Sequence, residues 1–141
     1  MPTSHKEIFK NIKNLKKSFC HSSAFFNKNL AISVGGYREI MIRSQDYDLW
    51  LRLLEKSKVG CINYFGAYLR EHEGRITEFD SGVEQNLYAY AAKVSYLIRR
   101  DYGIHSDPLN GNSIKKNDYF LKFLKKNLKV NGITNFHKLL F

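Results

Sequence analysis

A long segment of helical periodicity, residues 83–103, most constrains how this chain can fold. Apolar side chains recur in it every three or four residues and form one stripe: Leu87, Tyr90, Ala91, Val94, Leu97 and Ile98. Such a stripe needs another element to pack against, because an apolar helix face is costly in water. Residues 5–17 and 115–129 repeat the spacing with lysines between the apolar positions. Helices are therefore predicted at both ends of the chain.

Three short segments between these helices have the composition of β-strands. They are 21–26, 61–65 and 67–72, which are rich in aromatic or other β-compatible residues. Gly35 and Gly36 predict a left-handed backbone at the end of a short helical turn. The expected fold class is α/β, with too few strands for a complete doubly wound sheet.

Two aspartates lie at the start of a further predicted helix, QDYDLWLRLLEKS (45–57). Residues three or four apart share a helix face, so Asp46 is expected on the apolar face with Trp50. Asp48 is expected on a mixed, solvated face, where it would pair with Arg52 one turn later.

Spacing alone leaves three interpretations of Asp46. It could be a first-turn acid stabilised by the helix dipole, a catalytic carboxylate at a cleft, or a metal ligand. Ser44, just before the helix, is expected to be its N-cap. A carboxylate on an apolar face is costly unless it is paired, caps a helix or lines a cleft.

Four motifs follow one another along residues 18–95. They are His-Ser-Ser at 21–23, Gly-Gly-Tyr-Arg-Glu at 35–39, Gln-Asp-Tyr-Asp-Leu-Trp at 45–50 and Tyr-Leu-Arg-Glu-His at 68–72. In this order they resemble the acceptor-side half of family 2 glycosyltransferases of the A-type fold. The resemblance implies a partial A-type fold that lacks the N-terminal nucleotide-binding half and is followed by C-terminal helices. It divides the chain into a basic N-terminal helix, an acceptor-side half and a basic helical tail, at 1–17, 18–103 and 104–141.

The resemblance implies inverting transfer of a sugar from a nucleotide-sugar to a glycan or lipid-linked acceptor. It places the catalytic base on Asp46, which would take the proton of the acceptor hydroxyl. Gln45 stands where glutamate is common in that family. Substrate contacts are implied for a further set of residues, with His72 also a candidate metal ligand: Gln45, His21, Gly36, Trp50, Arg70, His72 and Arg75.

Several of these residues keep a purely structural interpretation. His21 can be a hydrogen-bonded residue of the framework, and Trp50 can belong to the core. Arg70 and His72 can form a solvated strand end beside two glutamates.

The resembling enzymes hold Mg²⁺ or Mn²⁺ on the donor diphosphate with an Asp-x-Asp motif in their nucleotide-binding half. Residues 1–20 supply no such half, and Asp46 and Asp48 are expected on different helix faces. A truncated or split enzyme is therefore expected, with donor and metal held by a separate donor-half chain. The alternative is a catalytically inactive remnant or interaction module that lacks donor binding.

The net charge of +10 is concentrated at the two ends of the chain, while residues 21–112 sum to zero. This pattern argues against a nucleic-acid partner, since the central motifs would have no role in it. The basic helix 115–129 suits either contact with an anionic membrane surface or ordinary core packing. Free Cys20 and Cys61 and the lack of a long apolar run predict a cytoplasmic protein, with peripheral contact at the inner membrane face left open.

Overall fold

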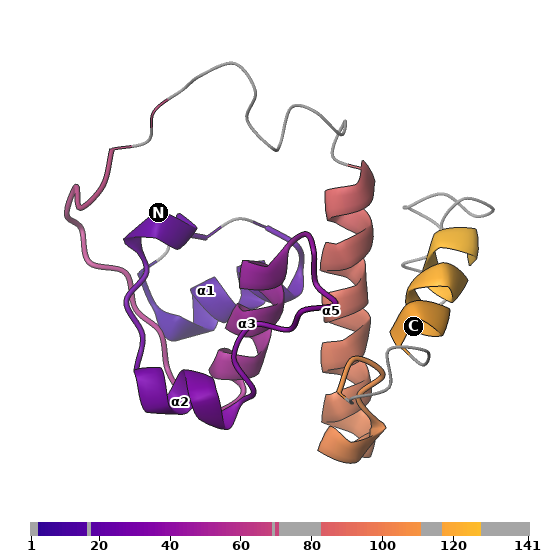
Figure 1. Cartoon of the computed structure of the whole chain (residues 1–141). Helices are drawn as coiled ribbons and strands as arrows, with labels where there is room; N and C mark the ends of the chain where they lie inside the picture. The colour runs from indigo at the N-terminus through magenta and orange to yellow at the C-terminus, as the bar shows by residue number, and fades with distance from the viewer. Residues whose placement is uncertain (1–2, 17, 69, 71–82, 111–116, 128–141) are drawn as a thin grey trace.

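The computed structural model describes residues 3–16, 18–68, 70, 83–110 and 117–127. Its helices are α1 (His5–Lys13), α2 (Lys28–Ser33), α3 (Gln45–Leu54) and α5 (Val83–Tyr102), with 3₁₀ turns η1 (His21–Ser23) and η2 (Ile104–Ser106). A further helical segment covers 117–127. In Figure 1, α5 stands between α3 and this last segment.

Local capping explains where the first two helices begin. The Ser4 side chain accepts a hydrogen bond from the Glu7 amide (3.4 Å), and the Asn27 side chain accepts one from the Leu30 amide (3.0 Å). Each cap pairs an amide that has no partner within its helix.

One hydrophobic core is shared by helices from both ends of the sequence. Its most deeply buried apolar side chains are Ile8 of α1, Leu49 and Leu51 of α3, Ala91 and Ala92 of α5, and Leu124 of segment 117–127. Full burial of a leucine or isoleucine contributes about 1.5–3 kcal/mol each. The helices predicted at both ends of the chain are confirmed, although α1 ends at Lys13 rather than at residue 17.

The expected α/β class is wrong, and the expected partial A-type glycosyltransferase fold is wrong for the same reason. No β-strand occurs in the described part of the chain. Residues 21–23 form η1, and residues 61–65 are non-helical with mostly exposed side chains. The Cys61 amide does donate to the Thr3 carbonyl (3.3 Å), but one bond makes no ladder. A β-compatible sequence becomes a strand only where a neighbouring strand pairs with it.

The glycine pair after α2 forms the predicted left-handed turn. Gly35 has φ +88° and Gly36 has φ +60°. The Gly36 amide donates to the Ala31 carbonyl (2.8 Å) and the Gly35 amide to the Ile32 carbonyl (2.9 Å). These two bonds define a Schellman C-cap, which reverses the chain after α2.

Ser44 precedes α3 as predicted, but its side chain does not cap the helix. The residue has φ +51°, and its hydroxyl donates to the Gln85 carbonyl of α5 (2.9 Å). The predicted cap is therefore wrong, because this side chain connects two helices instead.

Segment 117–127 buries its apolar side and exposes its lysines. Leu121 and Leu124 join the core, whereas Lys122, Lys125 and Lys126 are exposed. None of the described helices has the length and apolar content needed to cross a membrane. Contact with a membrane surface stays a prediction.

Candidate functional site

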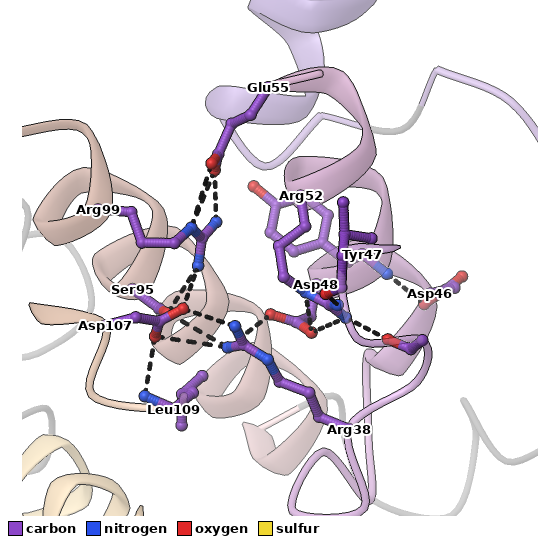
Figure 2. A network of polar contacts seen from close by, with 12 residues as sticks. Arg38, Asp46, Tyr47, Asp48, Arg52, Glu55, Ser95, Arg99, Asp107 and Leu109 are labelled. Atoms are coloured by element: carbon purple, nitrogen blue, oxygen red, sulfur yellow. Dashed lines mark hydrogen bonds and ion pairs between the residues drawn. The ribbon is translucent and has the colours of Figure 1, made fainter. Parts of the chain in front are cut away.

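Asp46 lies in the first turn of α3 with a half-buried side chain. Its Oδ1 accepts a hydrogen bond from the Tyr47 amide (2.8 Å). Figure 2 shows that no other dashed contact reaches this carboxylate, which lies apart from the arginines around Asp48. Among the described residues it forms no ion pair.

Two hydrogen-bonding side chains, Tyr37 and His21, lie close to each other and to this helix. Tyr37 follows the glycine turn, and its Oη is 3.5 Å from Nε2 of His21 in η1. Burial and the nearby Asp46 carboxylate together raise the pKa of Tyr37. The phenol therefore stays protonated at neutral pH and can donate a hydrogen bond.

Trp50 forms the apolar side of this group. It lies one turn after Asp46 on α3, and its ring centroid is 5.6 Å from that of His21. Phe26 and Phe19 pack edge-on against it at 5.4 and 5.3 Å. Because Trp50 is only 9% exposed, most of its indole belongs to the core.

These contacts place a carboxylate, a phenol, an imidazole and an indole around one end of α3. We call Asp46, Tyr37, His21 and Trp50 the Asp46 site. Aromatic side chains with a few placed hydrogen-bonding groups are typical of sites for small molecules. A carboxylate without a cation beside it can also accept a proton from a bound hydroxyl.

Asp48 is buried, so its predicted position on a solvated face is wrong. Its side chain is 0% exposed, and its Oδ2 accepts from Nε (3.0 Å) and Nη2 (2.6 Å) of Arg52. Nη1 of Arg38 lies 3.4 Å from the other oxygen. The predicted Asp48–Arg52 pair is confirmed, and the two guanidinium groups allow the carboxylate to be buried.

The pair belongs to a larger network that joins α3 to α5 (Figure 2). Arg38 also binds Asp107 through Nη2 and Oδ2 (2.5 Å), and Asp107 binds Nη1 of Arg99 (2.8 Å). Arg99 in turn binds Glu55 of α3 (2.5 Å), while Ser95 donates to Asp107. Three arginines and three carboxylates make the network neutral: Arg38, Arg52, Arg99, Asp48, Asp107 and Glu55.

Two of the three arginines of this network have pKa values shifted in opposite directions. Burial lowers the pKa of Arg52 below its usual value, although Asp48 opposes this effect. Burial would also lower the pKa of Arg99, but its hydrogen bonds to Glu55 and Asp107 raise it above the usual value. Both side chains stay charged at neutral pH. The network therefore has a structural role and offers no free base.

The remaining predicted site residues divide into three groups. Gln45 is exposed and directly precedes Asp46 in the chain. The backbone carbonyl of Gly36 accepts a hydrogen bond from Nη2 of Arg52 (2.7 Å). Arg70 is exposed, and no described contact joins it to the Asp46 site. The predicted roles of His72 and Arg75 fall on positions outside the described residues.

Asp46 and Asp48 do not form a metal pair, because Asp48 is held by Arg38 and Arg52. In the described part of the chain, no three His, Cys, Asp or Glu side chains form a group able to hold a metal ion. The residues present there do not fit the Mg²⁺ or Mn²⁺ that the resemblance implies.

The sequence interpretation missed Tyr37 as a member of the site and missed most of the buried network. Tyr37 and Arg38 could have been selected, because they follow the glycine turn directly. Ser95, Arg99 and Asp107 gave no such signal, since their contacts form only when α5 and the segment after it fold back.

No known protein family, characterised protein or solved structure matches the chain. The site is therefore defined by its side chains alone. Its distinguishing feature is the difference between Asp46, which has no ion pair among the described residues, and Asp48, which is enclosed by two arginines.

Proposed function

We propose that this chain supplies the acceptor side of an inverting glycosyltransferase, in which Asp46 is the catalytic base. The reaction transfers a sugar from a nucleotide-sugar to a hydroxyl of a glycan or lipid-linked acceptor. The observation that supports it most is the state of Asp46: half-buried, in the first turn of α3, and without an ion pair among the described residues.

The chemistry assigned to the site is a single displacement. Asp46 removes the proton from the acceptor hydroxyl while that oxygen attacks the anomeric carbon from the face opposite the leaving nucleotide diphosphate. The new glycosidic bond has the inverted configuration, and the proton ends on Asp46.

The other members of the Asp46 site bind the acceptor in this proposal. Tyr37 and His21 exchange hydrogen bonds with its hydroxyl groups, and the small exposed part of Trp50 contacts an apolar patch of the sugar ring. Gln45, exposed beside the base, adds a further donor and acceptor.

Donor binding is assigned to a separate donor-half chain, which would also hold the divalent metal and the diphosphate. The carboxylates at 46–48 are poorly suited to that task, because Asp48 is occupied by two arginines. Without a positioned donor, the base has no electrophile to direct the acceptor toward, and transfer stays slow. In this proposal the protein works in the cytoplasm, where nucleotide-sugars are made.

A second candidate is a catalytically silent interaction module. It is favoured by the segment 61–68, in which four large apolar side chains are at least 78% exposed: Ile62, Tyr64, Phe65 and Tyr68. Exposed aromatic side chains grouped along a chain are typical of surfaces that bind other proteins. Glycan binding at the Asp46 site separates the two candidates.

Trp50 provides the test, because it is the only tryptophan of the chain. Its emission is recorded while the protein is titrated with neutral oligosaccharides of glucose, galactose, mannose and N-acetylglucosamine. The proposal expects a saturable change with at least one of them, lost in Asp46→Asn and retained in Asp118→Asn. Asp118 is a matched control because it is a half-exposed aspartate on segment 117–127. An unchanged emission with every sugar, or equal losses in both variants, would favour the interaction module.

A further inference from the structure

Segment 61–68 presents an apolar surface without any charged side chain. Its four large apolar side chains are 78–99% exposed: Ile62, Tyr64, Phe65 and Tyr68. No Asp, Glu, Lys or Arg lies between Lys58 and Arg70 in the sequence. Single exposed apolar residues are normal on a protein surface, but four within seven residues mark a site of interaction. Since the segment holds no charge, none has to be desolvated when it is covered.

The start of this segment is bonded to the N-terminal end of α1. The Val59 amide donates to Nδ1 of His5 (3.3 Å), and the Cys61 amide donates to the Thr3 carbonyl (3.3 Å). Val59 and Cys61 also pack against the core. Figure 1 shows the chain then leaving the helices and running outside them, on the side away from α5. The aromatic side chains therefore project from a loop that is held at its base.

Cations lie beside this loop. Lys56 and Lys58 precede it and are exposed, and Lys6 is exposed in the first turn of α1, next to His5. The net charge of the whole chain, +10, has the same sign. Neutral aromatic side chains accompanied by lysines are typical of segments that lie at an anionic membrane surface. The rings enter the headgroup region, while the lysines are attracted by acidic lipids.

The charge also distinguishes a lipid surface from a second copy of this chain. Two copies that each carry +10 repel one another, whereas an acidic bilayer attracts both. A protein partner is less well suited, because aromatic side chains that dominate protein interfaces lie in well-packed patches. The side chains of segment 61–68 project almost fully instead.

The basic helix 115–129, which could also contact a membrane, uses its apolar side elsewhere. Leu121 and Leu124 of segment 117–127 are buried in the core, so they are not available to lipid. Segment 61–68 has no such role in the core beyond Cys61 at its start. Its apolar side chains are free to enter a bilayer without unfolding any helix.

We propose that segment 61–68 binds the surface of a membrane that contains acidic phospholipids. Ile62 and Phe65 reach the start of the acyl chains, and Tyr64 and Tyr68 lie at headgroup level with their hydroxyls toward water. Insertion is shallow, because the Asn63 amide and the backbone of the loop need to stay hydrated. This inference does not depend on the glycosyl transfer proposed for the Asp46 site.

Vesicle binding by the full chain tests the proposal. Co-sedimentation is measured with vesicles that mix phosphatidylglycerol and phosphatidylcholine, and with vesicles of phosphatidylcholine alone. It is repeated with Tyr64→Ser/Tyr68→Ser and with Tyr102→Ser/Tyr119→Ser. The second pair is a matched control, because it removes the same two side chains from positions that are 76% and 73% exposed.

The proposal expects the wild type to bind the mixed vesicles more tightly than phosphatidylcholine alone. Binding should weaken about tenfold or more in the Tyr64/Tyr68 variant, through loss of apolar contact, and stay unchanged in the control. Both variants should melt like the wild type by circular dichroism, since all four tyrosines are exposed.

A reporter tryptophan locates the inserted segment independently of these losses. Brominated phosphatidylcholine in the mixed vesicles should quench the emission of Phe65→Trp more than that of the wild type, whose only tryptophan is the buried Trp50. Tyr119→Trp, on segment 117–127, should show no added quenching.

Three outcomes overturn the proposal. The first is no binding to the mixed vesicles. The second is a loss in the Tyr102/Tyr119 control as large as that in the Tyr64/Tyr68 variant, or added quenching in Tyr119→Trp alone. The third is a dimer that forms without vesicles in sedimentation velocity and is lost only in the Tyr64/Tyr68 variant, which would assign the segment to a second copy.

Discussion

Asp48 and Arg52 lie one turn apart on α3 and form an ion pair that is almost wholly buried. Nη2 of Arg52 is 2.6 Å from Oδ2 of Asp48, and the two side chains are 3% and 0% exposed. The same guanidinium donates to the Val34 carbonyl (2.5 Å) and the Gly36 carbonyl (2.7 Å). The pair therefore connects α3 to the glycine turn from which Tyr37 and Arg38 project.

The glycine turn should be sensitive to a single added methyl group. Gly36→Ala is expected to lower the free energy of unfolding by about 1–2 kcal/mol, because φ +60° disfavours a side chain. A Cβ at this position meets no other part of the protein within 4 Å, so the loss comes from the local backbone conformation alone. Gly60→Ala is the matched control, with its Cβ at an ordinary 3.7 Å from the Thr3 carbonyl oxygen. Urea unfolding measures both, and equal losses would contradict the role given to the turn.

Tyr47→Phe tests the contact between α3 and α1. The Tyr47 hydroxyl donates to the Ile12 carbonyl, and burial raises the pKa of Tyr47 well above its usual value. Removal of the hydroxyl should cost about 1 kcal/mol of unfolding free energy, as for loss of one partly buried hydrogen bond. Tyr119→Phe, at a position 73% exposed, should be neutral. A Tyr47→Phe variant as stable as the wild type would exclude this contact.

Asp107 should make the stability of the protein depend on acid pH. Burial would raise its pKa, but hydrogen bonds from Arg38, Ser95 and Arg99 hold it below the ordinary value of 3.8. A lowered folded-state pKa contributes stability that is complete above the unfolded-state value and is lost as pH falls through the folded-state value. The wild type should therefore lose stability as pH falls below about 4.

Asp107→Asn is the variant that isolates this contribution. It should be less stable than the wild type at pH 7 and should lose less stability between pH 4 and pH 2. Asp118→Asn, a half-exposed aspartate, should follow the wild type at every pH. Parallel curves for the wild type and Asp107→Asn, measured by urea unfolding, would show that Asp107 does not carry the effect.

Local periodicity predicted the helices correctly and failed for the strands. The stripes in 5–17, 83–103 and 115–129 correspond to α1, α5 and the segment 117–127, because the helical spacing of a stripe can be seen within one stretch of sequence. Residues 21–26 and 61–65 have β-compatible side chains, but a strand also needs a partner elsewhere in the chain. Composition carries no information about that partner.

The same limit explains what was missed at the site. The spacing of Asp48 and Arg52 predicted their pair, but the burial of Asp48 depends on Arg38, ten residues earlier in the chain. Arg38 is in turn held by Asp107, which is 69 residues away in sequence. Arg38 and Asp107 both lie outside α3, so residue spacing within that helix could not predict their contacts. His21 and Trp50 were predicted as site residues and do lie together, whereas Tyr37 was not selected.

The two neighbouring aspartates differ in role: Asp48 stabilises the fold, whereas Asp46 is proposed to bind a ligand. Urea unfolding of Asp46→Asn and Asp48→Asn tests it directly. Asp48→Asn leaves a buried network with an excess positive charge and should lose about 3–5 kcal/mol of unfolding free energy. Asp46→Asn loses only its interaction with the helix dipole and should stay within about 1 kcal/mol of the wild type. Equal losses, or a larger loss for Asp46→Asn, would contradict this difference between the two aspartates.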